Sequence, residues 1–345
     1  MPEHPFRRIT VDRPLRAVVV GAGGMGRGWI RTVTASTIVE LAAVVDLNPA
    51  AAEAAVADLD GVAHGQSLSE AVSATGADIV IDVTIPEAHH AVTLEALGLG
   101  LPVLGEKPLA ATLSEAVDLV RAAEAAGELF MVSQNRRYNP HLWTLKAHTQ
   151  TIGDIGILTH EFFKAPHFGG FRDAMDHPLI LDMAIHNFDA ARFLLDADPV
   201  SVYCEEYNPS WSWYDGDAAA TAIFQMNGGS RFIYTGSWCS EALETSWNSN
   251  WRVSGSQGSA TWDGDNEPAV QLLSGSETVT APELPGEGLA GSLADFVQAL
   301  RTGTPPMLDA HDNLQSLAMV HAAIKSSTTG APVRIADILK EAGYV

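Results

Sequence analysis

The sequence predicts an α/β protein in two parts: a doubly wound parallel sheet, followed by an α+β domain with a large, mostly antiparallel, open-faced sheet. Three observations predict this class. Apolar segments alternate with alanine-rich ones up to about residue 135. Short strand-like segments separated by Gly, Asn and Ser follow from about residue 151. A chain of 345 residues also exceeds what one core usually holds, so two domains are expected.

Composition narrows the class of protein. The formal net charge of −22 repels phosphate backbones, so nucleic acid is not an expected partner. Two cysteines, Cys204 and Cys239, indicate neither a disulfide framework nor a metal site. Residues 1–14 are polar and read as a loose arm rather than a secretory signal, and no apolar run is long enough to span a membrane. We therefore expect a cytoplasmic protein without a membrane partner.

The N-terminal domain is expected over residues 15–136. Its predicted strands are RAVVVG, VELAAVVD, ADIVIDVT, LPVLGE and LFMVSQN. The segments between them consist mainly of good helix formers and predict helices at 49–58, 67–74, 88–98 and 112–126. Strands that are apolar throughout are buried on both faces, which requires helices on both sides of a parallel sheet.

A glycine motif, GAGGMG, follows the first strand and precedes a helix. Gly21, Gly23 and Gly26 have the spacing G-x-G-x-x-G, with Gly24 and Met25 inside it. The motif is weak alone, but between a strand and a helix it is typical of a dinucleotide-binding Rossmann domain, where the loop approaches the pyrophosphate.

An acidic residue ends the second predicted strand. Asp46 lies 46 − 26 = 20 residues after the last glycine, the usual place for a carboxylate that binds the ribose hydroxyls. Leu47 and Asn48 follow it, so no adjacent cation favours a 2′-phosphate. The alternative is that Asp46 only caps the helix starting at Pro49. With the glycine motif, the sequence predicts NAD as the cofactor.

The C-terminal domain, expected over residues 137–345, contains strand-like segments such as GILTHEFFKA, VSVYCEEYN, AAATAIFQM, SRFIYTGSW, WRVSGS and GSATWDG. Helices are expected near 179–195, 290–302 and 311–328. They are too few to cover both faces of the sheet, so a second subunit should cover one face, in a homodimer or homotetramer.

The helix near 179–195 carries Asp182, His186 and Asp189 in an otherwise apolar run. Offsets of four and three residues place them on one helix face. This arrangement suits a core histidine satisfied by its own helix, and it also suits acid–base chemistry. For Asp189, a structural partner at the helix surface is the simpler interpretation.

Further motifs complete a resemblance that runs from about Leu15 to Ile335. TIPEAHH, EKP, NRRY and the Asp-x-x-x-His pair follow the glycine loop in the order found in the Gfo/Idh/MocA family of NAD(P)-dependent sugar and cyclitol oxidoreductases, which this sequence resembles. The resemblance implies cofactor-binding roles for the residues of the glycine loop and for Asp46, Thr84, Pro86, His90, Glu106, Lys107 and Asn135. It also suggests a cis Lys107–Pro108 bond.

The family's catalytic positions match Lys107, Asp182 and His186. The resemblance then implies oxidation of a secondary hydroxyl, in which His186 or Lys107 takes the proton and Asp182 orients the imidazole. The chain departs from the family where His177, Pro178 and Ala184 replace glycines, which affects substrate fit.

Substrate-binding candidates lie in three loops. They are Lys164, His167, Arg172 and Asp173 in the first; Asn135, Arg137 and Tyr138 in the second; and Trp211, Trp213 and Tyr214 in the third. The tryptophan loop fits a pocket and a subunit interface equally well.

Two other functions stay open beside a dehydrogenase. Some relatives act as redox-neutral glycoside hydrolases, which oxidise a sugar transiently at the same Lys/Asp/His site. A non-catalytic NAD-binding sensor is disfavoured because it needs no proton-transfer groups.

Overall fold

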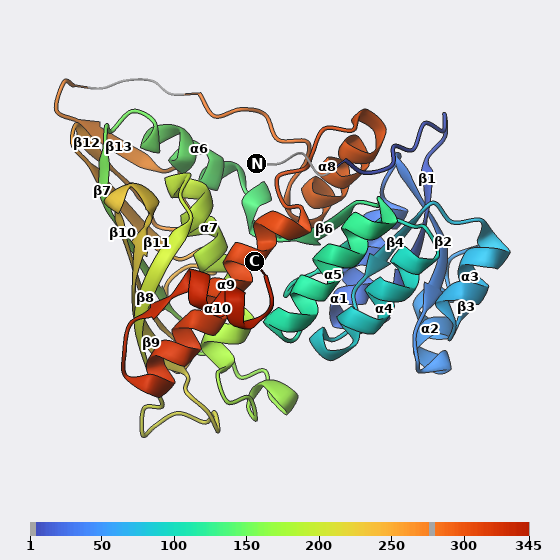
Figure 1. The fold of residues 1–345 in the computed structure, drawn as a ribbon, viewed down its shortest axis with the longest axis horizontal. Helices are drawn as coiled ribbons and strands as arrows, with labels where there is room; N and C mark the ends of the chain where they lie inside the picture. The colour runs from blue at the N-terminus through green and yellow to red at the C-terminus, as the bar shows by residue number, and fades with distance from the viewer. Residues whose placement is uncertain (1–4, 276–279, 345) are drawn as a thin grey trace. The chain divides into compact units, whose positions relative to one another are not determined.

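The computed structural model describes residues 5–275 and 280–344, and the chain forms two compact units (Figure 1). The first unit contains residues 1–135 and 284–314, and the second contains 136–283 and 315–345. The predicted division, with one crossing at residue 136, therefore misses a returning segment. That segment carries α8 (Gly288–Thr302), whose buried side chains include Phe296 and which contacts α1 and β6 of the first unit.

The first unit is built on six parallel strands in the order β3-β2-β1-β4-β5-β6. The strands are β1 (Leu15–Val20), β2 (Val39–Val45), β3 (Ala63–Gly65), β4 (Ile79–Asp82), β5 (Val103–Glu106) and β6 (Phe130–Ser133). The order reverses between β1 and β4, and ligands of such sheets bind beyond the carboxyl ends of the strands at that point.

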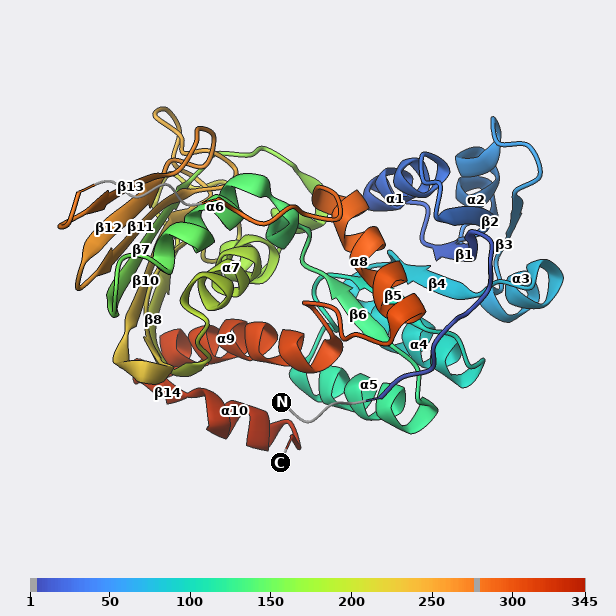
Figure 2. The ribbon, with the colours of Figure 1, turned by 90° about the horizontal axis from the view of Figure 1, so that it is seen from above.

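Helices cover both faces of this sheet, as predicted. They are α1 (Gly24–Thr34), α2 (Pro49–Val56), α3 (Leu68–Thr75), α4 (Pro86–Gly98) and α5 (Leu113–Ala126). Figure 2 shows α1 and α2 on one face and α3, α4 and α5 on the other. Local sequence fixes the ends of α5: Thr112 and Glu115 form a capping box, and Gly127 ends the helix with a φ of 64°.

The N-terminal arm is attached to the first unit over its described residues, contrary to expectation. The backbone N–H of Arg7 donates to the carbonyl of Gly127, at 2.7 Å, and that of Ile9 donates to the carbonyl of Leu300, at 2.9 Å. The Ile9 side chain is buried. An apolar residue in a polar segment thus ties the arm down, and residues 1–4 lie outside the described residues.

The second unit is built on an eight-stranded sheet in the order β13-β12-β11-β7-β10-β9-β8-β14. Its strands are β7 (Ile155–Phe163), β8 (Pro199–Tyr207), β9 (Ala219–Met226), β10 (Arg231–Ser237), β11 (Asn250–Gly255), β12 (Gly258–Trp262), β13 (Ala269–Leu272) and β14 (Val333–Arg334). The pair β10–β7 is parallel and the others are antiparallel, which confirms the predicted class.

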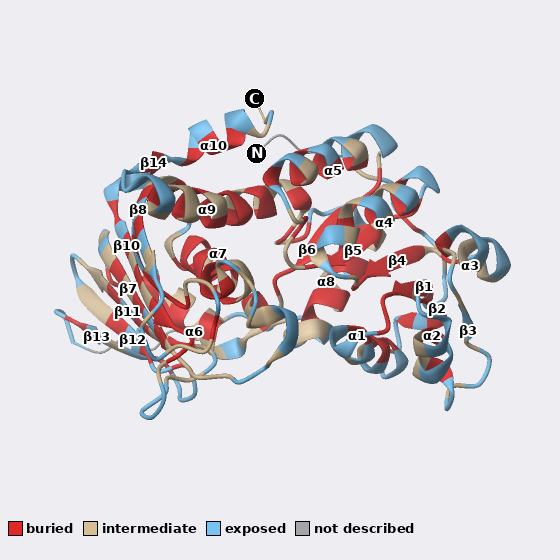
Figure 3. Ribbon diagram, turned by 90° about the horizontal axis from the view of Figure 1, so that it is seen from below, coloured by how far each residue is buried: buried red, intermediate tan, exposed pale blue. Residues whose placement is uncertain are grey.

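Helices lie along one face of this sheet: α6 (Pro140–Thr149), α7 (Ile185–Leu195) and α9 (Ala310–Thr329) (Figure 2). The short α10 (Ile335–Glu341) contacts β8. From Ala220 to Met226 the side chains of β9 are alternately buried and exposed, and Ile223 is one of the exposed ones. Figure 3 shows the contrast between the buried α7 and the exposed positions on the strands. None of the helices in the described parts of the chain could cross a membrane.

Candidate active site

The glycine loop joins β1 to α1, and its glycines have different constraints. Gly21 has a φ of 103°, and a Cβ there would lie 2.5 Å from the carbonyl oxygen of Val83. A Cβ on Gly26 would lie 2.0 Å from the carbonyl oxygen of Gly21. Gly23 and Gly24, in contrast, have no atom within 4 Å of an added Cβ. The outer glycines therefore shape the turn, and the middle ones leave open backbone for a pyrophosphate.

The N-terminus of α1 fits the same ligand. Gly23 is its N-cap residue and has no side chain that could satisfy the first N–H groups of the helix. Free N–H groups at a helix N-terminus favour an anion such as a pyrophosphate. The residues present thus suit NAD, the cofactor predicted from the sequence.

Asp46 follows β2 and lies against the glycine loop. Its Oδ2 accepts from the backbone N–H of Ala22, at 2.7 Å, and its Oδ1 accepts from that of Asn48, at 2.8 Å. Asn48 caps α2 through the N–H of Ala50, so the helix does not depend on Asp46 for its cap. Leu47 beside it is 86% exposed and presents no cation. The carboxylate is thus held where a ribose would follow the pyrophosphate.

Lys107 lies directly after β5 in a turn fixed by buried groups. The Lys107–Pro108 bond is cis, as predicted. The buried Glu106 carboxylate accepts from Trp29 Nε1 at 2.7 Å and from the N–H of Lys107 at 3.2 Å. Burial raises the pKa of Glu106. Glu106 therefore joins α1 to the turn that carries Lys107, which is a positioning role.

A buried histidine supports this turn from α4. His89 Nδ1 lies 2.8 Å from the carbonyl oxygen of Pro108, and its Nε2 lies 3.1 Å from that of Thr84. Thr84 itself donates to Asp82. His90, the residue selected from the sequence, is instead part-exposed, and its Nε2 pairs with Asp118 at 2.7 Å. The internal role belongs to His89, and the burial pattern of α4 is the signal that distinguishes the two.

In the second unit, the predicted helix over 179–195 has two parts. Residues Leu179–Ala184 form a π-helical turn and α7 follows, so Asp182 and His186 do not lie on one regular α-helix. The Asp182 carboxylate accepts from Arg172 Nε at 2.6 Å. Arg172, expected to bind substrate, thus holds the predicted catalytic acid. His177, before the turn, pairs with the buried Glu206.

Asp189 and Arg137 form a buried pair. The guanidinium donates to both carboxylate oxygens, at 2.7 and 2.8 Å, and Ser316 donates to the same carboxylate. Arg137 was expected to contact substrate, but its side chain is buried in this structural pair. Asp189 is structural, as expected, although it is buried rather than at the surface of the helix.

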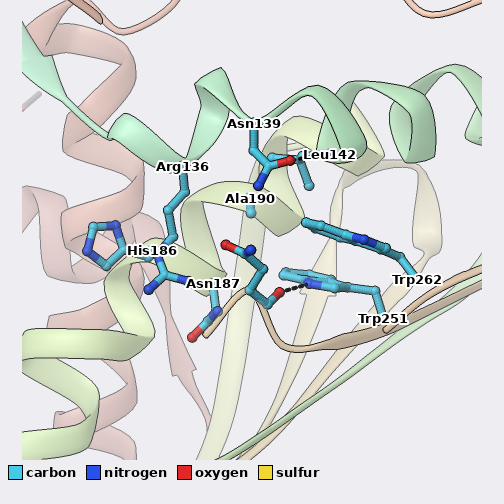
Figure 4. Close-up of a pocket in the computed structure, with 9 residues that line it drawn as sticks. Arg136, Asn139, Leu142, His186, Asn187, Ala190, Trp251 and Trp262 are labelled. Atoms are coloured by element: carbon cyan, nitrogen blue, oxygen red, sulfur yellow. Dashed lines mark hydrogen bonds between the residues drawn. The ribbon is translucent and has the colours of Figure 1, made fainter. Parts of the chain in front are cut away.

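His186 lines a pocket of the second unit together with Arg136, the residue before Arg137 (Figure 4). The other residues that line it are Asn139, Leu142, Asn187, Ala190, Asn248, Trp251 and Trp262. Burial lowers the pKa of Arg136 to about 10. The NRRY motif alone did not indicate Arg136, because adjacent arginines in a short 3₁₀ turn point in different directions. Asn135 begins this turn, Asn135–Tyr138.

The loop at 164–173 forms its contacts with acidic and aromatic residues of the same unit. Lys164 pairs with Glu244 at 2.6 Å, and His167 lies 3.2 Å from Glu241 and stacks on Trp213. Both side chains thus have carboxylate partners. In the tryptophan loop, the Tyr214 hydroxyl donates to the carbonyl of Pro166 and Trp211 Nε1 donates to that of Cys239, although Trp211 is 72% exposed. The tryptophan loop therefore holds the 164–173 loop, whatever else it binds.

Comparison with known proteins agrees with this arrangement. A family model described as oxidoreductase family, NAD-binding Rossmann fold, matches residues 15–134, and one described as GFO/IDH/MocA C-terminal domain matches residues 127–261. The chain is 27% identical to the rhizopine catabolism protein MocA of Rhizobium meliloti, covering 89% of this chain and 93% of that protein. It is 24% identical to an inositol 2-dehydrogenase of Rhizobium meliloti, and the match covers 93% of this chain and 99% of that protein.

Among solved structures, an oxidoreductase from Agrobacterium radiobacter in complex with NAD+, L-tartaric acid and magnesium has a TM-score of 0.83 at 22% identity. The match covers 94% of this chain and 99% of that one. The two proteins therefore have the same two-unit fold although their sequences are only distantly similar.

Proposed function

The chain belongs to the Gfo/Idh/MocA oxidoreductase family, and from this we propose that it is an NAD-dependent dehydrogenase acting on a secondary hydroxyl of a sugar, sugar derivative or cyclitol. The observation that supports this most is the open glycine loop with the Asp46 carboxylate held against it. The similarity to an inositol 2-dehydrogenase favours a polyhydroxylated substrate.

The residues of the chain have separate roles in the proposed reaction. NAD, when bound, accepts the hydride from the carbinol carbon. His186 takes the hydroxyl proton, because an imidazole exchanges protons near neutral pH. Asp182, itself held by Arg172, orients the proton acceptor. Lys107 stabilises the negative charge that develops on the substrate oxygen.

Purified protein incubated with NAD and a panel of cyclitols, aldoses and anhydrosugars tests the proposal. We expect NADH absorbance to rise with at least one compound, and a lack of NADH with all of them would contradict it. Aryl glycosides should be included in the panel. Release of the aglycone without net NADH would instead indicate the redox-neutral glycosidase.

We also propose that the protein is a homodimer or homotetramer joined through the second unit. The open face of its sheet exposes Tyr203 and Ile223, apolar side chains that a monomer would leave in water. A second copy of the same face would bury them, as in symmetric dimers.

A further inference from the structure

The side chain of Arg136 is charged, and no carboxylate of the described residues pairs with it. Its guanidinium donates to the backbone carbonyl of Trp247 and contacts Met183 Sδ at 3.6 Å. Within residues 5–275 and 280–344 no carboxylate pairs with it. A desolvated guanidinium without a counter-ion is unfavourable, and this chain has 42 acidic residues against 20 basic ones that could have supplied one.

The nearby acidic groups are already paired with other arginines. Asp182 accepts from Arg172 at 2.6 Å, and Asp189 binds Arg137 through both oxygens. Behind Arg136, on β7, lies the fully buried His160. Burial, with the charge of Arg136, lowers the pKa of His160 to about 3, so this imidazole is neutral and supplies no counter-charge either.

The surroundings of Arg136 suit a polyhydroxylated ligand. Figure 4 shows its guanidinium between His186 and Asn187. Asn139 and Asn248 line the same pocket and offer amide groups to hydroxyls, and Trp251 and Trp262 offer aromatic faces. The pocket leaves about 10 Å³ for the centre of a water-sized group, about enough for one such group, so only the tip of a ligand would enter it.

We propose that Arg136 binds a carboxylate of the substrate, so that the compound oxidised beside His186 is a sugar acid of the aldonate or uronate type. This inference rests on the proposed dehydrogenase function and names its substrate class. A guanidinium matches a carboxylate with two parallel hydrogen bonds. A phosphate monoester carries up to two negative charges, and Arg136 is the one permanent cation among the lining residues, so the carboxylate is the better match.

Matched pairs of substrates test this proposal. NADH formation should be measured with glucuronate and glucose, galacturonate and galactose, and gluconate and glucitol, with glucose 6-phosphate added as a phosphate probe. We expect kcat/KM for the preferred acid to exceed that of its neutral partner at least tenfold. Equal values for each pair, or preferential use of the phosphate, would overturn the proposal and leave the dehydrogenase function intact.

Variants of Arg136 locate the effect. Arg136→Gln should lower kcat/KM for the acid about 10- to 100-fold, mainly through KM, and leave the neutral partner within threefold. Arg136→Lys should recover part of the loss. Arg252→Gln, which removes an exposed arginine of the same unit, should change neither value. An equal loss on acid and neutral sugars would show a structural role and overturn the proposal. If Arg136→Gln does not fold, the proposal is tested by Arg136→Lys and by the ratio of kcat/KM for the acid to that for the neutral sugar in the parent protein.

Calorimetry keeps the two proposals distinguishable. Glucuronate, galacturonate and gluconate are titrated into the NAD-loaded parent protein and into Arg136→Gln. Binding by the parent that the variant loses supports the carboxylate site even if no NADH forms, a result that would count only against the dehydrogenase proposal. Lack of binding of all three acids to the parent overturns the carboxylate site.

Discussion

His89 and His90 are adjacent in the sequence and have opposite surroundings. Both ring nitrogens of His89 face backbone carbonyl oxygens, which only accept hydrogen bonds. His89 thus holds the Thr84 and Pro108 turns together, whereas His90 contributes an ion pair at the surface.

The paired variants His89→Ala and His90→Ala separate these roles. We expect His89→Ala to lower the free energy of unfolding by about 1–3 kcal/mol, because the carbonyls of Thr84 and Pro108 lose their imidazole partner. It should also lower turnover, since the Lys107 turn loses its support. His90→Ala should cost about 1 kcal/mol or less. Urea unfolding and NADH assays measure both effects, and similar losses in the two variants would contradict the assignment.

Asp46 should determine the choice between NAD and NADP. The double substitution Asp46→Ser, Leu47→Arg removes a carboxylate that repels a 2′-phosphate and adds a cation that attracts it. We expect the ratio of kcat/KM for NADP to that for NAD to rise at least tenfold, about 1.4 kcal/mol. Asp58→Ser, which changes an exposed acid beyond α2, is the control. A parent protein that prefers NADP would refute the ribose assignment.

The predicted proton-transfer groups should affect turnover more than folding. His186→Ala and Lys107→Ala should each retain NAD binding and lose about 10²–10⁴-fold in kcat. The double variant should lose less than the product, because the two groups act as a unit. Asp182→Asn should also lower turnover while the protein stays folded. For the parent, oxidation should increase as pH rises and the base loses its proton. A kcat/KM for His186→Ala within threefold of the parent would end this assignment.

Among the helices, α7 (Ile185–Leu195) carries both the buried Asp189 and His186, the proposed proton acceptor. Asp189→Ala would leave the Arg137 guanidinium buried without its partner, so we expect a loss of about 3–5 kcal/mol in unfolding free energy. Adding Arg137→Met should recover most of it, because the charge is then removed as well. Urea denaturation of both variants and of the parent measures this. A double variant as unstable as the single one would show that packing, rather than charge, dominates.

The helices and strands that have a clear hydrophobic pattern were predictable from the sequence. Continuous apolar runs predicted the strands of the parallel sheet, and short strand-like runs separated by Gly, Asn and Ser predicted those of the other sheet. These patterns did not predict β3, which is three residues long and largely exposed, nor α6 and α10. The π-helical turn at 179–184 was not predictable either, because the apolar spacing of LILDMA does not distinguish a wider turn from an α-helical one.

The candidate site was predictable in its motifs but not in the direction of its side chains. The glycine loop and Asp46 were found because strand, turn and helix fix them locally. The sequence pointed to His90 rather than His89, and to Arg137 rather than Arg136. The two members of each pair are adjacent in the chain, and on a helical turn adjacent side chains point in different directions. Only the packing of α4 and of the 3₁₀ turn determines which member of each pair faces inward.

For the whole molecule, the open sheet face predicts the oligomeric state. Light scattering at micromolar concentration should give a dimer or tetramer. Ile223→Asp should dissociate it, because a carboxylate would be buried in the interface. Leu99→Asp, an exposed apolar position of the first unit, should leave the assembly unchanged. A monomeric parent would refute the interface.

The return of residues 284–314 to the first unit has a consequence for synthesis in the cell. The nucleotide-binding half is nearly complete at residue 135, yet the helix that carries Phe296 emerges from the ribosome only after strands β7 to β13 of the second sheet. Roughly 180 further residues must be added, which takes about 10–35 s at about 5–20 residues per second. During that interval the apolar surface of α1 and β6 that α8 later contacts stays exposed. The two halves therefore finish folding almost together, although one of them begins much earlier.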